Sequence, residues 1–192
     1  FDAAYFKARD IRKNVNVVFV VDGNMENKPF VKPIISTIQL SYDYLKSGTS
    51  ENNYKFGSVI YRKKAYSACS SGDKSIEVSE LSSQYKQLTN KLSSSFDSEI
   101  CEFTDLPAST NFYSGVDRAC RMLHGKEKET NIIIILGGAS SNNTNISITD
   151  LAARTSRLNA SIIGFQVNNG ADISYEDFYD DLKSLLLTNS NN

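Results

Sequence analysis

Two nearly continuous apolar runs dominate the hydrophobic pattern of the chain. They are VNVVFVV at residues 15–21 and NIIIIL at residues 131–136, and neither alternates regularly with polar residues. Such runs are typical of central parallel strands that helices cover on both faces. Weaker patterns of the same kind predict strands at residues 54–62 and 160–167. Residues 75–81 (SIEVSEL) alternate polar and apolar side chains, which indicates a half-exposed edge strand.

Five segments with apolar residues at helical spacing separate or follow these strands. They cover residues 29–46, 82–92, 112–123, 149–158 and 174–187. We expect Pro33 to lie in or near the first turn of its helix, where a missing N–H is tolerated, and Thr149 to cap the fourth helix. The strand–helix alternation predicts an α/β fold with a doubly wound, mostly parallel sheet and helices on both faces. The direct step from residues 54–62 to 75–81 predicts one antiparallel edge strand.

The chain length and composition fit one domain. With 192 residues, 40% of them hydrophobic and 22% charged, the chain can bury a single core. We expect one domain over residues 1–192, with a lead-in at 1–14 and a frayed tail at 188–192. Because Phe1 is not an initiator methionine, we expect an excised or processed fragment. The net charge of −1 gives no overall attraction for nucleic acid or anionic lipid, and no apolar run approaches the roughly 20 residues of a membrane span.

The three cysteines are too few to hold a small fold together by disulfides. Cys120 lies in a helical pattern and is expected to be a small core residue. Cys69 and Cys101 lie in loop-like sequence, where an oxidising compartment would allow them to pair.

Candidate chemistry lies just beyond the carboxyl ends of the strands, where open α/β sheets bind their ligands. The first such loop, FVVDGNMEN, places Asp22 at the end of a buried strand, followed by Asn24 and Glu26. This arrangement resembles the Asp-x-Ser-x-Ser motif of von Willebrand factor type A (vWA) domains. In that family the three side chains converge on a divalent cation.

Two further loops strengthen the resemblance. PASTNFYSGVDRAC is similar to the vWA segment in which a Gly-Thr-Asn turn opens a helix, so that Thr110 corresponds to an oxygen ligand and Asn111 follows it. IIIILGGAS resembles the strand that ends in Thr-Asp-Gly, and it places Gly137 where the family has its second Asp. The resemblance extends from about Val15 to Leu187, although no single motif is intact.

The departures from the family pattern change the expected function of this site. Mg²⁺ favours a small octahedral shell of oxygens with compensating negative charge. The chain keeps Asp22 and Thr110, but Glu26 is longer than the serine it replaces and position 137 has no carboxylate. We therefore expect no cofactor and a partner-binding face formed by Asp22, Asn24, Glu26, Thr110, Asn111 and Gly137. Weak Mg²⁺ binding by the first four of these residues remains the alternative.

Catalytic patterns are weaker, and we expect no enzyme. His124 is the only histidine, and its place before Gly125 suits a side chain that complements a helix dipole. Asn24 stands where an Asp-x-Asp phosphatase needs its second Asp, and the GGASS loop at 137–141 lacks the P-loop lysine. The basic clusters at residues 62–64 and 126–128 are interpreted as solvated charge. A phosphohydrolase or nucleotide-binding enzyme of similar topology remains the rival hypothesis.

The resemblance implies a protein-interaction module. Its partner would be another protein or another domain of the same protein, with no nucleic acid and no membrane insertion. The composition and the ending SYEDFYDDLKSLL resemble vWA modules of cell-envelope and secretion proteins of Bacteroidetes, the TssR-like component of type VI secretion being one candidate. A metal-dependent adhesin-type vWA domain is the alternative. Among the possible locations of the protein, an extracytoplasmic one is favoured. The resemblance also implies a sixth strand near the C-terminus, which vWA domains usually have.

Overall fold

The computed structural model describes residues 13–23, 27–47, 52–62, 75–97, 111–138, 145–167 and 173–189. Within these ranges five strands form one sheet in the order β3-β2-β1-β4-β5. The strands are β1 (Asn14–Asp22), β2 (Asn53–Tyr61), β3 (Ile76–Ser82), β4 (Thr130–Gly137) and β5 (Ala160–Gln166). The helices are α2 (Lys28–Ser47), α3 (Tyr85–Asp97), α4 (Phe112–Met122), α5 (Ile148–Arg157) and α6 (Ile173–Thr188).

The sheet is parallel except at one edge. Strand β1 pairs in parallel with both β2 and β4, and β4 pairs in parallel with β5. Strand β3 pairs antiparallel with β2, as the direct connection between them predicts. The α/β fold class, the doubly wound order and the antiparallel edge strand are thus confirmed.

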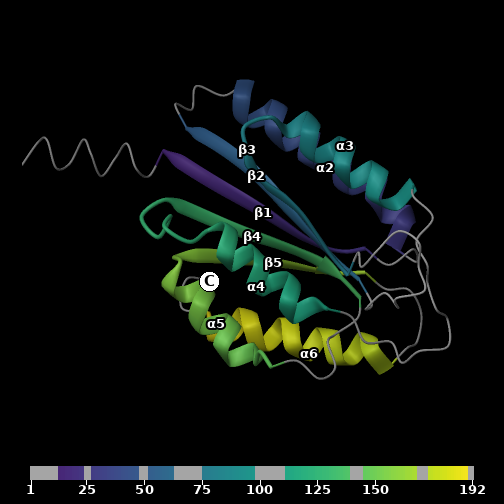
Figure 1. The fold of residues 1–192 in the computed structure, drawn as a ribbon, viewed down its shortest axis with the longest axis vertical. Helices are drawn as coiled ribbons and strands as arrows, with labels where there is room; N and C mark the ends of the chain where they lie inside the picture. Colours follow the sequence, from purple (N-terminus) through teal and green to yellow (C-terminus); the bar gives the residue numbers. More distant parts are fainter. Residues whose placement is uncertain are drawn as a thin grey trace, which may run out of the picture.

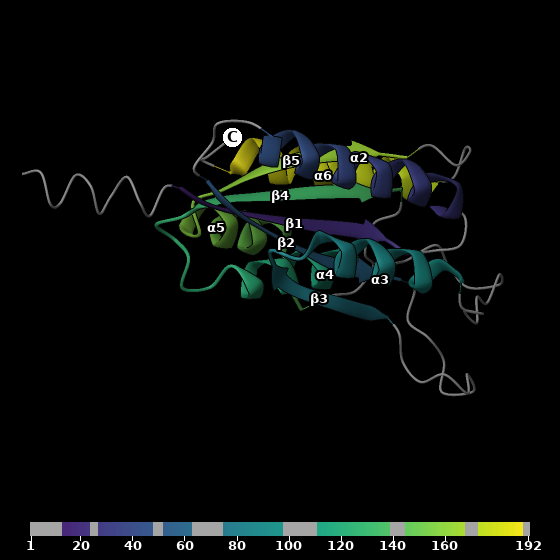
Figure 2. The same cartoon turned by 90° about the horizontal axis from the view of Figure 1, so that it is seen from above.

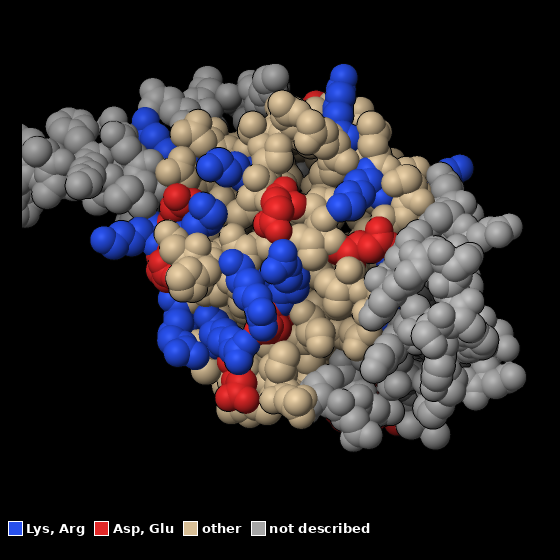
Figure 3. Space-filling model, viewed as in Figure 1, with Lys and Arg blue, Asp and Glu red and all other residues tan. Residues whose placement is uncertain are grey.

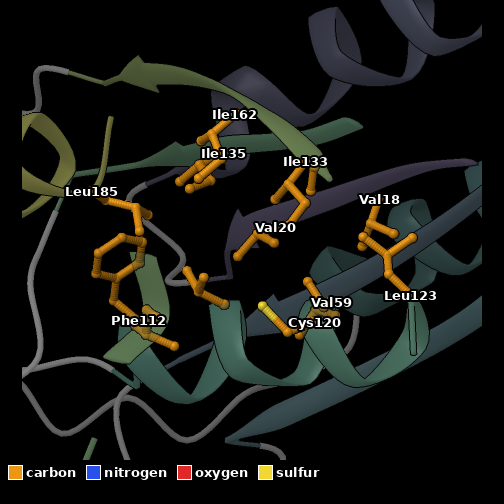
Figure 4. Close-up of a cluster of buried hydrophobic side chains, with 14 of the residues drawn as sticks. Val18, Val20, Val59, Phe112, Cys120, Leu123, Ile133, Ile135, Ile162 and Leu185 are labelled. Carbon is orange, nitrogen blue, oxygen red and sulfur yellow. The ribbon is translucent and has the colours of Figure 1, made fainter. Parts of the chain in front are cut away.

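Helices cover both faces of the sheet, which explains why the central strands lack polar alternation. Helices α2 and α3 lie on one face, and α4, α5 and α6 lie on the other (Figures 1 and 2). Val18 and Val20 of β1 pack toward α4, whereas Val17, Phe19 and Val21 pack on the opposite face. The larger core includes Val59 of β2, Ile133 and Ile135 of β4, and Phe112, Cys120 and Leu123 from α4 and its end (Figure 4).

The starts of two helices can be compared with their predictions. Pro33 lies inside α2 just after its first turn, because the helix begins at Lys28, one residue before the predicted start. A proline here leaves one carbonyl of the preceding turn without its usual N–H partner. Helix α5 is capped by Ser147 rather than Thr149: the Ser147 side chain accepts a hydrogen bond of 3.1 Å from the Asp150 N–H. Asp150 lies in the first turn of α5, where its negative charge interacts favourably with the positive end of the helix dipole.

No helix in the described ranges is long and apolar enough to cross a membrane.

Candidate functional site

Three of the six predicted partner-binding residues lie in the described part of the chain, at one end of the sheet. Asp22 ends β1, Gly137 ends β4, and Asn111 directly precedes α4. Strands β1 and β4 are parallel neighbours with Val21 opposite Leu136, so Asp22 and Gly137 lie side by side at the carboxyl end of the sheet. Asp22 is only 2% exposed. The other three predicted residues, Asn24, Glu26 and Thr110, lie outside the described residues.

A buried tyrosine occupies the position beside these residues. Tyr61 ends β2, pairs with Asp22 in the sheet register and is fully buried. A β-carbon added at Gly137 would lie 2.1 Å from the Tyr61 hydroxyl oxygen, far inside van der Waals contact. A β-carbon at Gly115 of α4 would lie 3.0 Å from the Tyr61 ring. The phenol therefore fits between two positions that have no side chain.

Tyr61 belongs to an aromatic cluster beneath this end of the sheet. Its ring centroid lies 5.7 Å from that of Phe112, and the Phe112 centroid lies 5.0 Å from that of Phe178 on α6. All three side chains are fully buried. Tilted aromatic pairs of this kind stabilise a core by about 0.5–1.5 kcal/mol each beyond their area burial. The cluster joins β2, α4 and α6 into one packed unit.

The Tyr61 hydroxyl is the polar atom in this cluster, and it has no hydrogen-bond partner among the described residues. Burial, and to a smaller extent the negative charge of Asp22, raises the pKa of the Tyr61 phenol well above its ordinary value. The phenol is therefore neutral at physiological pH. A neutral phenol adds no negative charge to the site.

Arg62, which follows β2, organises the edge of the site that faces α3. It is 3% exposed, so the prediction of solvated charge at this residue is wrong. Its Nε donates a 2.9 Å hydrogen bond to the Gly23 carbonyl, and its Nη2 donates a 3.0 Å bond to the Ser95 carbonyl at the end of α3. Its Nη1 forms a salt bridge with Glu77 of β3. One guanidinium thus joins the end of β1, the edge strand and a helix.

The backbone around Arg62 continues this network toward α4. The N–H and the Nδ2 of Asn111 both donate to the Arg62 carbonyl, at 3.2 and 2.8 Å. The Gly23 N–H donates to the Tyr61 carbonyl at 2.7 Å. A β-carbon at Gly23 would lie 2.4 Å from Ile60 and 2.8 Å from the Arg62 Nε, so this position requires glycine for close approach. The two hydrogen bonds of Asn111 thus hold the start of α4 against the residue that follows β2.

Sequence reasoning missed Arg62 because three consecutive basic residues are usually solvated. The signal lay in its position directly after a buried strand and in the acidic partner that the edge strand supplies. Glu77 pairs with Ile60 in the register of β2 and β3, and it also accepts a 3.0 Å hydrogen bond from the Ser95 hydroxyl. A cation at the end of a buried strand, with a carboxylate beside it in the next strand, indicates a buried ion pair.

The described part of the site does not fit the cation shell that the vWA resemblance implies. Asp22 offers one carboxylate, but Gly137 offers no ligand, and the Tyr61 hydroxyl fills the space into which a side chain there would project. A hard divalent cation prefers several oxygen ligands with negative charge, and a neutral phenol is a poor replacement for a carboxylate. Across the described ranges no group of three His, Cys, Asp or Glu side chains could hold a metal ion.

The single histidine is remote from Asp22. Helix α4 starts beside the Arg62 carbonyl and runs back along the sheet (Figure 1). His124 follows the end of α4 and therefore lies at the opposite end of the sheet, where the parallel strands begin. Cys120 is a buried core residue, as predicted, and burial raises the pKa of its thiol to about 12. A thiol with this pKa is protonated at neutral pH and is a weak nucleophile. Cys69 and Cys101 lie outside the described residues.

The sheet order, the helices on both faces and the polar residue at the end of β1 define an α/β domain of the vWA type. The chain belongs to the family described as the TssR protein VWA domain, whose model matches residues 3–192. The resemblance to vWA domains and to their TssR-like members is thus confirmed. No curated protein matches the chain.

Two crystal structures of the pilus adhesin SpaC from Lactobacillus rhamnosus GG share this fold. The open conformation has a TM-score of 0.63 at 9% identity, covering 90% of this chain and 26% of SpaC. A second form of the same adhesin has a TM-score of 0.59 at 10% identity, covering 90% of this chain and 27% of SpaC. The chain thus spans about a quarter of the adhesin, and at this identity the likeness concerns the fold alone.

Proposed function

We propose that this vWA domain is a non-enzymatic protein-interaction module that binds its partner without a divalent cation. The contact face is the carboxyl end of the sheet. The buried Asp22 and Gly137 lie beneath it and Asn111 borders it, and the predicted residues Asn24, Glu26 and Thr110 extend it. The observation that carries the proposal is the position of the Tyr61 hydroxyl against Gly137. A vWA cation site depends on a carboxylate at that position, and here a buried phenol fills the space it would need.

The Arg62 network gives this face a fixed framework without a metal. In a metal-dependent vWA domain, the cation itself would draw the loops together. Here a buried guanidinium binds the Gly23 carbonyl and the end of α3, while its own carbonyl binds Asn111. These hydrogen bonds hold the end of β1 and the start of α4, which are the described borders of the proposed face. A prearranged face loses less conformational entropy when a partner binds.

The family assignment suggests the setting. A TssR-type vWA domain is expected to be one part of a larger secretion or cell-envelope protein, with another subunit or another domain of the same chain as its partner. Fold alone does not identify that partner, because vWA-like folds carry many different functions.

Metal-dependent ligand binding of the adhesin type is the second candidate, because Asp22 keeps the first carboxylate of the vWA pattern. A third candidate is a phosphohydrolase, which would need a general acid and a nucleophile near Asp22. If the purified chain hydrolysed p-nitrophenyl phosphate and Asp22→Asn abolished that activity, the non-enzymatic proposal would be wrong.

Site-specific photo-crosslinking in the full-length parent protein tests the proposed face. The crosslinker p-benzoylphenylalanine would replace Tyr113 or Gln166, which flank the face. Leu40 or Tyr44, which are exposed on α2 away from both the face and the other helices, would be replaced as controls. We expect the first two positions to give a discrete adduct with one partner, with or without EDTA. Adducts only from the control positions would refute the face, and loss of all adducts in EDTA would favour the metal-dependent candidate.

A further inference from the structure

An open groove of about 530 Å³ lies between the carboxyl-terminal ends of α4 and α5, remote from the proposed contact face. The α4–α5 groove, as we call it, is lined mainly by Arg121, His124, Arg154, Arg157, Cys120 and Leu158, with Asp117 beneath. We infer that this groove binds an acidic segment of a partner protein. This second interaction surface goes beyond the proposed function and does not depend on it.

A buried carboxylate holds two of the guanidinium groups in place. Asp117 of α4 is 4% exposed. Its Oδ2 accepts a hydrogen bond from Arg121 Nε at 2.9 Å and forms an ion pair with Arg121 Nη2 at 2.8 Å, and its Oδ1 pairs with Arg154 of α5. The Arg121 and Arg154 side chains nevertheless remain 67% and 41% exposed. Because a guanidinium has five N–H donors, each arginine keeps donors for a second carboxylate.

The ends of the two helices that form the groove are fixed to the sheet. Asn131, at the start of β4, is buried, and its Nδ2 donates 2.8 Å hydrogen bonds to both the Lys126 and the Leu158 carbonyls. The Asn131 Oδ1 accepts a 2.9 Å bond from Asn16 of β1. The groove is therefore a rigid feature of the fold, and its cations are positioned before a ligand arrives.

Positive charge is in excess around the groove. Figure 3 shows Lys and Arg side chains gathered over α4 and α5. Among the described residues, Arg157 donates only to the Ala153 carbonyl of its own helix, at 3.2 Å. Of the two carboxylates that line the groove, Asp117 is already shared by two arginines, and Glu127 accepts a hydrogen bond from the Gly125 N–H. The groove thus presents guanidinium groups that can bind additional carboxylates in a forked geometry.

The local fields favour side-chain carboxylates over phosphate. Both helices present their carboxyl-terminal ends to the groove, and the partial negative charge of these ends disfavours a phosphate dianion more strongly than a singly charged carboxylate. Phosphate sites are typical of helix amino-terminal ends instead. The overall net charge of −1 provides no general attraction for nucleic acid. Leu158 and Cys120 add apolar surface for the aliphatic part of a peptide.

The test uses fluorescence anisotropy of a fluorescein-labelled peptide of Glu-Ala-Leu repeats, with a Gln-Ala-Leu peptide as the uncharged match. We expect the Glu peptide to bind the chain at low ionic strength and the Gln peptide not to bind. Arg157→Gln and Arg121→Gln should each weaken binding about two- to fivefold, as expected for exposed ion pairs. Arg118→Gln is the matched control: it lies on α4, pairs with Glu80 outside the groove and changes the net charge equally.

Several results would overturn the proposal. They are no binding of the Glu peptide at low salt, an equal loss with Arg118→Gln, or stronger binding of inorganic phosphate or of an oligonucleotide. Self-association of the chain in sedimentation that Arg157→Gln abolishes would identify a second copy as the occupant instead. Thermal melts of each variant confirm that it is folded, and backbone NMR shifts at Leu158 and Arg154 should locate the peptide in the groove.

Discussion

The Tyr61 hydroxyl lies 2.1 Å from the point where a β-carbon of residue 137 would stand, so Gly137 is required by the tyrosine that packs against it. The vWA resemblance predicts an aspartate at this position, and here the end of a buried phenol fills the space that its side chain would need. The two residues come from β2 and β4, on either side of Asp22 in the sheet order. The close approach of Tyr61 explains why residue 137 is a glycine.

Restoring the family's carboxylate by Gly137→Asp should destabilise the fold by about 3 kcal/mol or more. The new side chain would collide with Tyr61 and Phe178 and would bury a charge. Urea unfolding measures the change. Gly125→Asp is the control, because nothing lies within 4 Å of a β-carbon there and only the positive φ of +79° adds strain of about 1 kcal/mol.

The double variant Tyr61→Ala with Gly137→Asp should be more stable than the sum of its two single losses, because removing the ring creates space for the aspartate. Additive losses would show that the two side chains do not compete for the same space.

Tyr61→Phe should leave the free energy of unfolding unchanged or raise it by about 1 kcal/mol. A buried hydroxyl without a partner costs about 1–3 kcal/mol, and phenylalanine keeps the ring contacts with Phe112. Urea unfolding again decides. A loss above about 1 kcal/mol would mean that the hydroxyl has a hydrogen-bond partner.

Arg62→Ala should cost about 3–5 kcal/mol, because it leaves Glu77 without its cation and two backbone carbonyls without their donor. Arg118→Ala breaks an exposed pair with Glu80, whose side chains are 40% and 68% accessible, and should cost less than about 1 kcal/mol. Chemical denaturation of both variants gives the comparison. Similar losses for the two would contradict an organising role for Arg62.

Alkaline pH should destabilise the protein through Cys120 and Tyr61. Burial raises the pKa of the Cys120 thiol to about 12 and that of Tyr61 well above its ordinary value. The folded state therefore keeps both protons while the unfolded state loses them. The contribution of these two groups to the free energy of unfolding is complete at pH values below their pKa values in the unfolded state. It falls as pH rises toward their pKa values in the folded state, by about 1.4 kcal/mol per pH unit for each group.

The measurement is the free energy of unfolding at successive pH values above about 9, up to the folded pKa values. Combining Tyr61→Phe with Cys120→Ala should flatten this dependence, whatever the absolute stability of the variant. An unchanged slope would show that other groups cause the alkaline loss.

The central strands were predictable because helices cover them on both faces, which produces long apolar runs such as residues 15–21 and 131–136. The helices were predictable from apolar residues at helical spacing. The helix ends were harder. Ser147 and Thr149 are both good caps, and only the backbone geometry selects Ser147. Helix α2 begins at Lys28, one residue before the predicted start.

The candidate site was predictable only in its location. The positions of Asp22 and Gly137 were predictable because both residues end buried strands, and that of Asn111 because it directly precedes a helix. Tyr61 could not be singled out among ten tyrosines, because its role depends on packing against Gly115 and Gly137, which are distant in sequence. Arg62 was missed for a similar reason, since Glu77 and the Ser95 carbonyl approach it only in the folded sheet.

A thermal melt of the wild-type chain with increasing Mg²⁺ and Mn²⁺, compared with Asp22→Ala, shows whether the carboxyl end of the sheet binds a divalent cation. A ligand that binds only the folded state raises the melting temperature with its concentration. If the face binds no cation, the melting temperature of the wild type should not change with metal. A rise with metal that Asp22→Ala abolishes would contradict the proposed cation-free binding and would show that this face binds a divalent cation despite Gly137.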